Sequence, residues 1–300
     1  DIAGIEQLDY LDLFRKFGLS YGQQESYRLD HIAYVVLGDK KLSYEEHGSL
    51  QNLYLNDHQK YIDYNIQDVR LVQRLEEKMG LITLAMTMAY RGGVNYSQVF
   101  GTTAIWDAII HRQLQERKIV VPPKKDSMKV KYPGAYVKDP QVGMHNWVVS
   151  FDLASLYPNL IIQYNMSPET LHDVLPGVNV ETFLDNRVIP ADLYREDLTL
   201  SASGVRFTNA KQGVIPAIVE QYFNERKEIK GRMIRAKQEY EQSPTKKLEN
   251  EINSLENQQM SIKILMNSLY GALGNAYFRY FDSRVAEAIT TSGQLAIRYA

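Results

Sequence analysis

The chain has 300 residues, of which 44% are hydrophobic and 23% are charged, enough to bury a sizeable core in roughly one to three domains. Its 34 basic and 36 acidic residues give a formal net charge of −2, so the overall balance does not indicate a nucleic-acid partner. It contains no cysteine, which excludes disulfides, thiolate zinc sites and cysteine nucleophiles. No apolar run approaches the ~18 residues that span a bilayer, so we expect a soluble, cytoplasmic protein.

Both ends of the sequence are expected to be cut from a longer one. The first residue is Asp1 rather than methionine, and no basic-then-apolar leader follows it. The helical pattern of residues 283–300 reaches the last residue without a Gly or Asn cap.

Helical patterns dominate the first 120 residues. The clearest spans residues 61–79, where apolar side chains recur at helical spacing before the stop signal Gly80. A second helical region covers residues 81–120 and is interrupted by the paired glycines after Arg91. The paired prolines after Val121 then predict a linker.

The rest of the chain mixes strands with long helices. The β-favouring run at 147–151 predicts a buried strand. Residues 170–212, which are punctuated by Asn, Asp and Gly, are expected to form short strands and loops. Residues 216–240 and 246–270 predict two helices joined by a Ser-Pro turn, so they should form an antiparallel hairpin.

The carboxylate of Asp152 is the first candidate for catalysis. At the end of a buried strand it could hold a hard cation such as Mg²⁺, although an isolated aspartate there is more often a turn former or a helix cap. It begins the sequence Asp-Leu-Ala-Ser-Leu-Tyr-Pro, which is followed by Asn-Met-Ser-Pro-Glu-Thr. Together these sequences resemble motif A of the family B DNA polymerases, in a spelling close to the replicative enzymes of T-even-like phages.

The resemblance implies roles for five residues of this motif. Asp152 would bind two catalytic Mg²⁺ ions, for which Mn²⁺ could substitute, and the carbonyl group of Leu153 would help to hold the nucleotide-side ion. Tyr157 would be the steric gate, because an aromatic ring packed there leaves no room for a ribose 2′-hydroxyl. A tyrosine of the core is the alternative. Ser155 and Leu156 would complete this part of the nucleotide site.

Lys263, Asn267 and Tyr270 form a second constellation, because spacings of four and three place them on one face of a helix. Such a stripe is usually only a polar surface. Here it lies in Lys-Ile-Leu-Met-Asn-Ser-Leu-Tyr-Gly, which resembles motif B of the same family. The resemblance implies that Lys263 contacts the triphosphate and protonates the leaving pyrophosphate. Asn267 and Tyr270 would border the nascent base pair, and Gly271 would lie against DNA.

Arg226 and Lys230 lie one helical turn apart in a strongly basic stretch. Residues 226–237 hold six basic groups and only one acidic group, Glu228. A solvated helix face is the alternative to a phosphate site. In the family, the first arm of the fingers hairpin carries an Arg and a Lys that bind the triphosphate, and the resemblance assigns that role to this pair.

The sequence Tyr132-Pro133-Gly134-Ala135 resembles the family's Tyr-x-Gly-Gly/Ala element, which holds the template strand. Tyr132, Gly134 and Ala135 are therefore expected to contact DNA. Lys124 and Lys125 lie in a basic segment just before this element and would neutralise phosphates, with a solvated surface as the alternative.

Tyr64 and Asp68, spaced by four residues, resemble the third motif of the family's 3′-5′ proofreading exonuclease. The resemblance implies that Asp68 binds a metal ion and that the pair orients the attacking water. The first two exonuclease motifs of the family would precede Asp1, so this chain is not expected to hold a complete editing site.

No Asp-x-Asp sequence follows motif B. The family's motif C, Asp-Thr-Asp-Ser, supplies the partner carboxylate of the polymerase site and would follow Ala300. With one carboxylate the repulsion between two divalent ions would be poorly offset, so we expect the isolated chain to have little or no polymerase activity.

The resemblance implies an α+β multidomain fold that forms part of a right-hand polymerase. Its expected parts are the end of an RNase H-like 3′-5′ exonuclease domain at 1–80, an N-terminal-domain segment at 81–123, an incomplete palm at 124–211 and 276–300, and helical-hairpin fingers at 212–275. The expected partners are primer-template DNA and deoxynucleoside triphosphates, together with a sliding clamp and replisome proteins bound through other parts. A role in viral DNA replication in an infected bacterial cell is implied by the phage-like spelling.

Two alternatives remain open. The chain could be a non-catalytic, DNA-binding half of a split polymerase that requires a second chain. It could also belong to an RNA-dependent or RNA-making palm enzyme, although such an enzyme should carry a smaller residue than Tyr157 at the gate.

Overall fold

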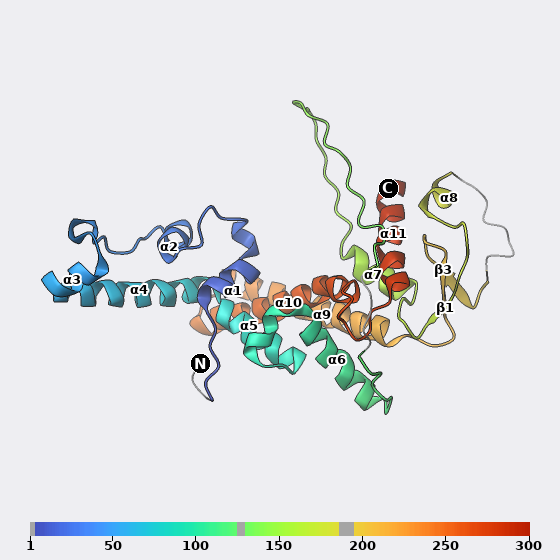
Figure 1. Ribbon diagram of the computed structural model, residues 1–300, viewed down its shortest axis with the longest axis horizontal. Coiled ribbons are helices and arrows are strands. Elements are labelled where there is room, and N and C mark those ends of the chain that lie inside the picture. Colours follow the sequence, from blue (N-terminus) through green and yellow to red (C-terminus); the bar gives the residue numbers. More distant parts are fainter. Residues whose placement is uncertain (1–3, 125–129, 186–194) are drawn as a thin grey trace. The chain divides into compact units, whose positions relative to one another are not determined.

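A computed structural model of the chain describes residues 4–124, 130–185 and 195–300 (Figure 1). Most of these residues lie in helices, and three short strands form one sheet, so the fold is α+β as predicted. No helix within the described ranges is both long enough and apolar enough to cross a membrane. The chain divides into two compact units, one formed by Asp1–Tyr90 with Asn95–Phe100, and the other by Arg91–Val94 with Gly101–Ala300.

Helices are the only regular secondary structure in the described part of the first unit. Its elements are α1 (Tyr10–Phe17), η1 (Leu19–Tyr21), α2 (Leu29–Leu37), η2 (Glu45–His47), α3 (Leu50–Asn56), α4 (His58–Met79), the greater part of α5 (Leu81–Gly92), and η3 (Tyr96–Phe100), where η denotes a 3₁₀ helix. In this unit α2 and α3 both pack against the long helix α4 (Figure 1).

The helix predicted at residues 61–79 is confirmed as α4, which begins three residues earlier. It starts at the N-cap Asp57, whose side chain accepts a 3.0 Å hydrogen bond from the backbone N–H of Lys60. It ends at Gly80, which adopts the left-handed conformation with φ of +62° and donates to the carbonyl of Glu76. The buried side chains of α4 include Leu71 and Leu75, which anchor it in the core of the first unit.

The second unit combines helices with the sheet. Its helices are α6 (Thr102–Glu116), α7 (Leu156–Gln163), α8 (Val180–Leu184), α9 (Val214–Gln242), α10 (Lys246–Leu273) and α11 (Ser283–Tyr299). Its strands, β1 (Leu171–Val174), β2 (Leu198–Leu200) and β3 (Val205–Thr208), form an antiparallel sheet in the order β1-β3-β2. The sheet confirms the strands expected between residues 170 and 212, whereas helix α8 was not expected there, and residues 186–194 lie outside the described ranges.

The predicted helical hairpin is confirmed as α9 and α10, which pack along each other. The turn ends at Thr245, whose hydroxyl accepts a 3.2 Å hydrogen bond from the backbone N–H of Leu248 and so caps α10. Trp106 of α6 is fully buried, and its indole N–H donates to the carbonyl of Leu265 at 3.2 Å and to the hydroxyl of Ser268 at 3.1 Å. These bonds fix α6 against the base of the hairpin.

Asn165 joins the segment after α7 to the start of the hairpin. It adopts a left-handed conformation with φ of +54°. Its side-chain amide donates to the carbonyls of Thr208 and Lys211, and its side-chain oxygen accepts from the N–H of Gly213, all within 2.9 Å. Glu169 accepts from the N–H of Val214, the first residue of α9. The start of α9 is therefore held by side chains of the preceding segment.

The prediction of a strand at residues 147–151 is wrong. Residues 148–151 form no ladder with any part of the chain that the structure describes, and the segment leading to α7 extends away from the helices of its unit (Figure 1). Trp147 and Phe151 are 98% and 93% exposed. A strand needs a neighbour that pairs with its backbone groups, and the β-favouring side chains cannot replace that neighbour.

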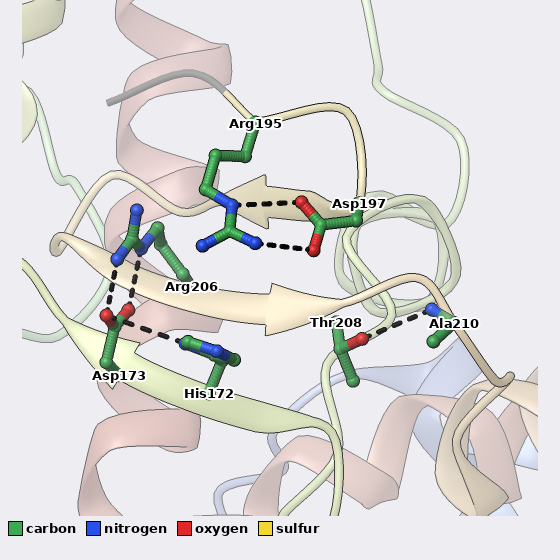
Figure 2. A network of polar contacts seen from close by, with 7 residues as sticks. All are labelled: His172, Asp173, Arg195, Asp197, Arg206, Thr208 and Ala210. Carbon is green, nitrogen blue, oxygen red and sulfur yellow. Dashed lines mark hydrogen bonds and ion pairs between the residues drawn. The ribbon is translucent and has the colours of Figure 1, made fainter. Parts of the chain in front are cut away.

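Ion pairs brace the surface of the sheet (Figure 2). Arg206 of β3 forms a two-pronged pair with Asp173 of β1, and Arg195 pairs with Asp197 at 3.0 and 2.9 Å. The Arg206 guanidinium holds the pKa of the Asp173 carboxyl below its usual value. Because these pairs are largely solvated, each contributes little to stability.

Candidate active site

The second unit contains a cavity of about 490 Å³ whose lining comes from three separate parts of the sequence. It lies where the segment before α7 meets the facing surfaces of α9 and α10. Its lining comprises residues 152–158, Ile161, Arg226, Lys263, Met266, Asn267 and Tyr270. Of the residues predicted to bind the nucleotide, Lys230 is exposed one turn further along α9 and does not line the cavity.

Asp152 reaches this cavity through a turn and not from the end of a strand. The chain turns into α7 at Ser155, the N-cap residue, which has a φ of +53°. Asn159 supports the turn by donating from its side-chain amide to the carbonyl of Ala154 at 2.9 Å. The burial of Leu160 and Ile161 then anchors α7. The sequence analysis did not anticipate this helix.

The carboxylate of Asp152 is exposed and forms no hydrogen bond or ion pair with any described residue. A free carboxylate beside the backbone of Leu153 offers the oxygen donors that Mg²⁺ prefers. The described residues contain no group of three or more histidine or acidic side chains that could hold a metal ion. The site therefore supplies one acidic ligand, and a two-ion centre would need another carboxylate beside it.

Lys263, Asn267 and Tyr270 lie along one face of α10 and line the cavity. The side chains of Lys263 and Asn267 are exposed, whereas Leu265 and Leu269 on the opposite face are buried in the core. Within the described ranges, the ammonium group of Lys263 has no acidic partner or hydrogen-bond acceptor. Its charge is thus available to an anion in the cavity.

Arg226 of α9 is held toward α10 by Gln259, a residue that the sequence analysis missed. Gln259 is only 5% exposed, and its side-chain oxygen accepts a 3.3 Å hydrogen bond from Nε of Arg226. Its amide group donates to Glu256 at 2.8 Å, which fixes the orientation of the amide. Burial lowers the pKa of the Arg226 guanidinium, and the charge of Glu256 opposes that shift. In the sequence, the spacing of four residues between Gln259 and Lys263 could have indicated that both lie on the same face of the helix.

Three tyrosines from three motifs meet beside the cavity. The rings of Tyr157 and Tyr270 lie 5.0 Å apart at an angle of 51°. Burial raises the pKa of Tyr157, and burial together with a hydrogen bond to Tyr132 raises the pKa of Tyr270. The hydroxyl of Tyr132 also lies 3.5 Å from the carbonyl oxygen of Gly274. The hydroxyls of Tyr157 and Tyr270 therefore remain protonated at neutral pH.

The element at residues 132–135 lies along α11. Thr290 donates to the carbonyl of Pro133 at 2.7 Å, and Gln294 donates to the carbonyl of Gly134 at 2.6 Å. Gly134 and Ala135 are exposed. Of the other residues predicted to contact DNA, Gly271 and Lys124 are exposed, and Lys125 lies outside the described residues.

The predicted exonuclease residues lie in the first unit, one turn apart on α4. Tyr64 is buried, and its ring packs edge-on against Tyr44 with the centroids 5.5 Å apart. Oδ2 of Asp68 pairs with Lys41 at 2.7 Å, while Oδ1 is buried with no hydrogen-bond partner in the described part of the chain. The Lys41 ammonium lies 4.7 Å from the ring centroid of Tyr64. The sequence analysis missed Lys41.

The environment of Lys41 favours its charged form. Although burial opposes the charge, the carboxylate of Asp68 raises the pKa of Lys41 above its usual value. The unpaired oxygen of Asp68 fits a ligand of a cation, but this part of the chain supplies one carboxylate and a competing lysine.

Comparison with known proteins identifies the family. The family model described as DNA polymerase family B matches residues 101–300 of the chain. The chain is 35% identical to the DNA-directed DNA polymerase of Escherichia phage RB69 and 32% identical to that of Enterobacteria phage T4, with 99% of this chain aligned in both cases. It is 34% identical to DNA polymerase 1 of Pyrococcus abyssi over 61% of this chain and 21% of that polymerase. The chain therefore belongs to DNA polymerase family B.

The family resemblance and its phage-like character, predicted from motifs A and B, are confirmed by these matches. The alignments cover 37% of the length of each phage polymerase, so the chain spans a little over a third of these relatives.

Proposed function

We propose that this chain supplies the nucleotide-binding part of a DNA-directed DNA polymerase active site, which adds deoxynucleotides to a primer 3′-end and releases pyrophosphate. The observation that carries the proposal is the convergence of Asp152, Tyr157, Arg226 and Lys263 on one cavity. An acidic group, an aromatic ring and two cations meet there from three parts of the chain. Membership of DNA polymerase family B supports the same reaction.

The cations of the hairpin provide the affinity for the triphosphate. Lys263 has no acidic partner among the described residues, and Gln259 holds Arg226 on the inner face of α9. Lys230 would join them if the hairpin closes over the nucleotide, since it lies one turn from Arg226. Lys263 would also donate a proton to the leaving pyrophosphate.

Tyr157 acts as the steric gate, and Asn267 and Tyr270 border the base pair that forms. The ring of Tyr157 lies beside that of Tyr270 and lines the cavity. A ribose 2′-hydroxyl would compete with this ring for space, so deoxynucleotides are preferred by exclusion. Ser155 and Leu156 complete the wall on the same side.

Asp152 and the carbonyl group of Leu153 would hold magnesium, for which manganese could substitute. Bound magnesium supplies charge neutralisation at the phosphates and lowers the pKa of the primer 3′-hydroxyl. With one carboxylate in the site, the 300-residue chain by itself is expected to have little or no polymerase activity. A second chain that brings another acidic pair, as in the sequence Asp-Thr-Asp-Ser, should restore it.

The remaining parts of the chain follow from the same assignment. We assign residues 1–80 to a 3′-5′ exonuclease domain, with Tyr64 and Asp68 at its editing site and Asp68 as a metal ligand. Residues 81–123 form an N-terminal-domain segment, residues 124–211 and 276–300 belong to the palm, and residues 212–275 form the fingers.

Primer-template DNA would lie against the element at 132–135, with Lys124 and Lys125 on its phosphates and Gly271 allowing close approach. A sliding clamp and replisome proteins would bind through other parts of the polymerase. The phage relatives support a role in viral DNA replication in the cytoplasm of an infected bacterium.

Primer extension and a gel-shift assay test the proposal. The chain should bind primer-template DNA alone, and it should extend the primer only with a partner chain that carries Asp-Thr-Asp-Ser. Binding without extension in both conditions would favour the alternative, a non-catalytic DNA-binding subunit. Incorporation of ribonucleotides at the rate of deoxynucleotides would favour an RNA-making enzyme and would contradict the role of Tyr157.

A further inference from the structure

Gly293 of α11 lies directly behind the ring of Tyr157. A Cβ atom added to Gly293 would lie 2.7 Å from Cε1 and 3.5 Å from Cδ1 of Tyr157, and 3.7 Å from a methyl carbon of Leu156. The first of these distances is shorter than carbon atoms tolerate without moving. Gly293 is buried within a helix whose φ is ordinary, so the backbone conformation does not require glycine. The close approach of the ring is what requires it.

Contacts on both sides of the Gly293–Tyr157 pair limit the directions in which an added side chain could be absorbed. On the Gly293 side, α11 is fixed by Thr290 and Gln294, which bind the carbonyls of residues 133 and 134. The hydroxyl of Ser292 accepts from the N–H of Ala202, which fixes the helix to the segment between β2 and β3. On the other side, the ring of Tyr157 contacts that of Tyr270. A side chain at 293 would therefore push the ring of Tyr157 toward the cavity.

We infer that Gly293 is a positioning residue for sugar selection: by lacking a side chain it seats the Tyr157 ring against α11 and leaves room for a deoxyribose but not for a ribose. This inference deepens the proposed function and rests on it. Gly293 does not line the cavity, and it acts only through Tyr157. The width of the sugar site is thus set by the pair of residues rather than by the tyrosine alone.

The test is a double-mutant cycle in a polymerase that contains these residues and extends primers. Gly293→Ala should lower kcat/KM for a deoxynucleotide by roughly 10- to 100-fold, because a displacement on the order of 1 Å at a reacting site has effects up to that size. In a Tyr157→Ala background the same change should have no effect, because the ring it displaces is absent. Gly231→Ala on α9, where an added Cβ meets no atom within 4 Å, is the matched control and should leave kcat/KM unchanged.

Each outcome decides the inference. An equal loss in both backgrounds would show a purely structural role for Gly293. No loss from Gly293→Ala in the enzyme that keeps Tyr157 would show that the ring is not displaced. Either result overturns the inference. If Gly293→Ala prevents folding, the melting temperature of the double variant decides: recovery with Tyr157→Ala supports the contact, and continued unfolding overturns it.

Failure of the proposed function gives a different result. If Tyr157→Ala alone does not increase the use of ribonucleotides, Tyr157 is not the gate and the proposed selection fails. The same cycle measured by melting temperature in the 300-residue chain still reports whether Gly293 and Tyr157 are coupled.

Discussion

The rings of Tyr157 and Tyr270 lie 5.0 Å apart and join the first turn of α7 to the last turns of α10. The contact ties the two family motifs together through side chains, because Tyr157 belongs to motif A and Tyr270 to motif B. A displacement of α10 is therefore expected to move the ring of Tyr157, which we propose faces the nucleotide sugar.

Replacing Tyr270 with Ala should release Tyr157 and destabilise the second unit. We expect a loss of about 2 kcal/mol in the free energy of unfolding, since Tyr270 is half-buried and large-to-small changes in a full core cost about 3–5 kcal/mol. Primer extension should also discriminate less against ribonucleotides. Urea unfolding and competition between dNTP and rNTP measure the two effects. Tyr270→Phe keeps the ring and should retain discrimination, so equal damage by both variants would contradict the coupling.

Gln259→Leu should weaken triphosphate binding through Arg226. The change keeps the volume of the side chain but removes the acceptor of the Arg226 Nε bond. A lost hydrogen bond to a charged group is worth about 1.5–3 kcal/mol, so we expect a rise of roughly 10- to 100-fold in the Kd for dNTP. Isothermal titration with dNTP and magnesium measures it. In an Arg226→Ala background, Gln259→Leu should cause no further rise in the Kd for dNTP. A rise of the same size in that background would show that Gln259 acts independently of Arg226.

The stability of the second unit should depend on both the side-chain amide and the left-handed backbone conformation of Asn165. Asn165→Ala removes three hydrogen bonds. It also leaves alanine, which disfavours the left-handed conformation, at a φ of +54°. We expect a loss of about 3 kcal/mol in the free energy of unfolding. Asn165→Gly removes the same bonds but tolerates the left-handed conformation, so it should be less damaging by about 1 kcal/mol. Glycine as harmful as alanine would show that the backbone conformation carries no strain.

Asp282 should make the stability of α11 depend on pH. It is the N-cap of the helix that carries Gly293, and it accepts from the N–H of Arg284 at 2.9 Å. Burial disfavours its charge, but hydrogen bonds from Arg284 outweigh burial and hold the pKa of Asp282 below its usual value. The stabilisation is therefore present above the unfolded pKa of about 3.9 and is lost as pH falls through the lower folded value.

Two substitutions separate the cap from the charge of Asp282. Asp282→Ala should lower the free energy of unfolding at neutral pH by about 1 kcal/mol, and Asp282→Asn, which keeps a capping oxygen, should lower it by less. The difference between wild type and Asp282→Asn should shrink as the pH falls below the unfolded pKa. Urea unfolding at a series of pH values checks this, and a difference that grows in acid would contradict the sign of the shift.

The sequence predicted the long helices well because their signals are local. Gly80 ends α4, Thr245 and the preceding Ser-Pro turn separate α9 from α10, and the apolar spacing of the hairpin matches its buried face. The face that carries Lys263 and Asn267 was also predictable, since helical spacing alone places both on one side.

Features that depend on long-range packing were not predictable in the same way. The run at 147–151 favours β structure, but no described segment pairs with it, so local preference failed. The contacts of Gly293 with Tyr157 and of Lys41 with Asp68 join residues far apart in the sequence or on different elements. No spacing rule brings such residues together, and Gln259 looked like an ordinary polar residue until its burial beside Arg226 was known.

Asp152→Ala in a polymerase that contains this chain tests the central claim most directly. Primer extension is measured with dNTP and magnesium, and binding of primer-template DNA is measured in parallel by gel shift. The account predicts that extension is abolished while DNA binding stays at the wild-type level, because the carboxylate is needed for the chemical reaction and does not contribute to DNA binding. Extension at a rate near that of the wild type would contradict it.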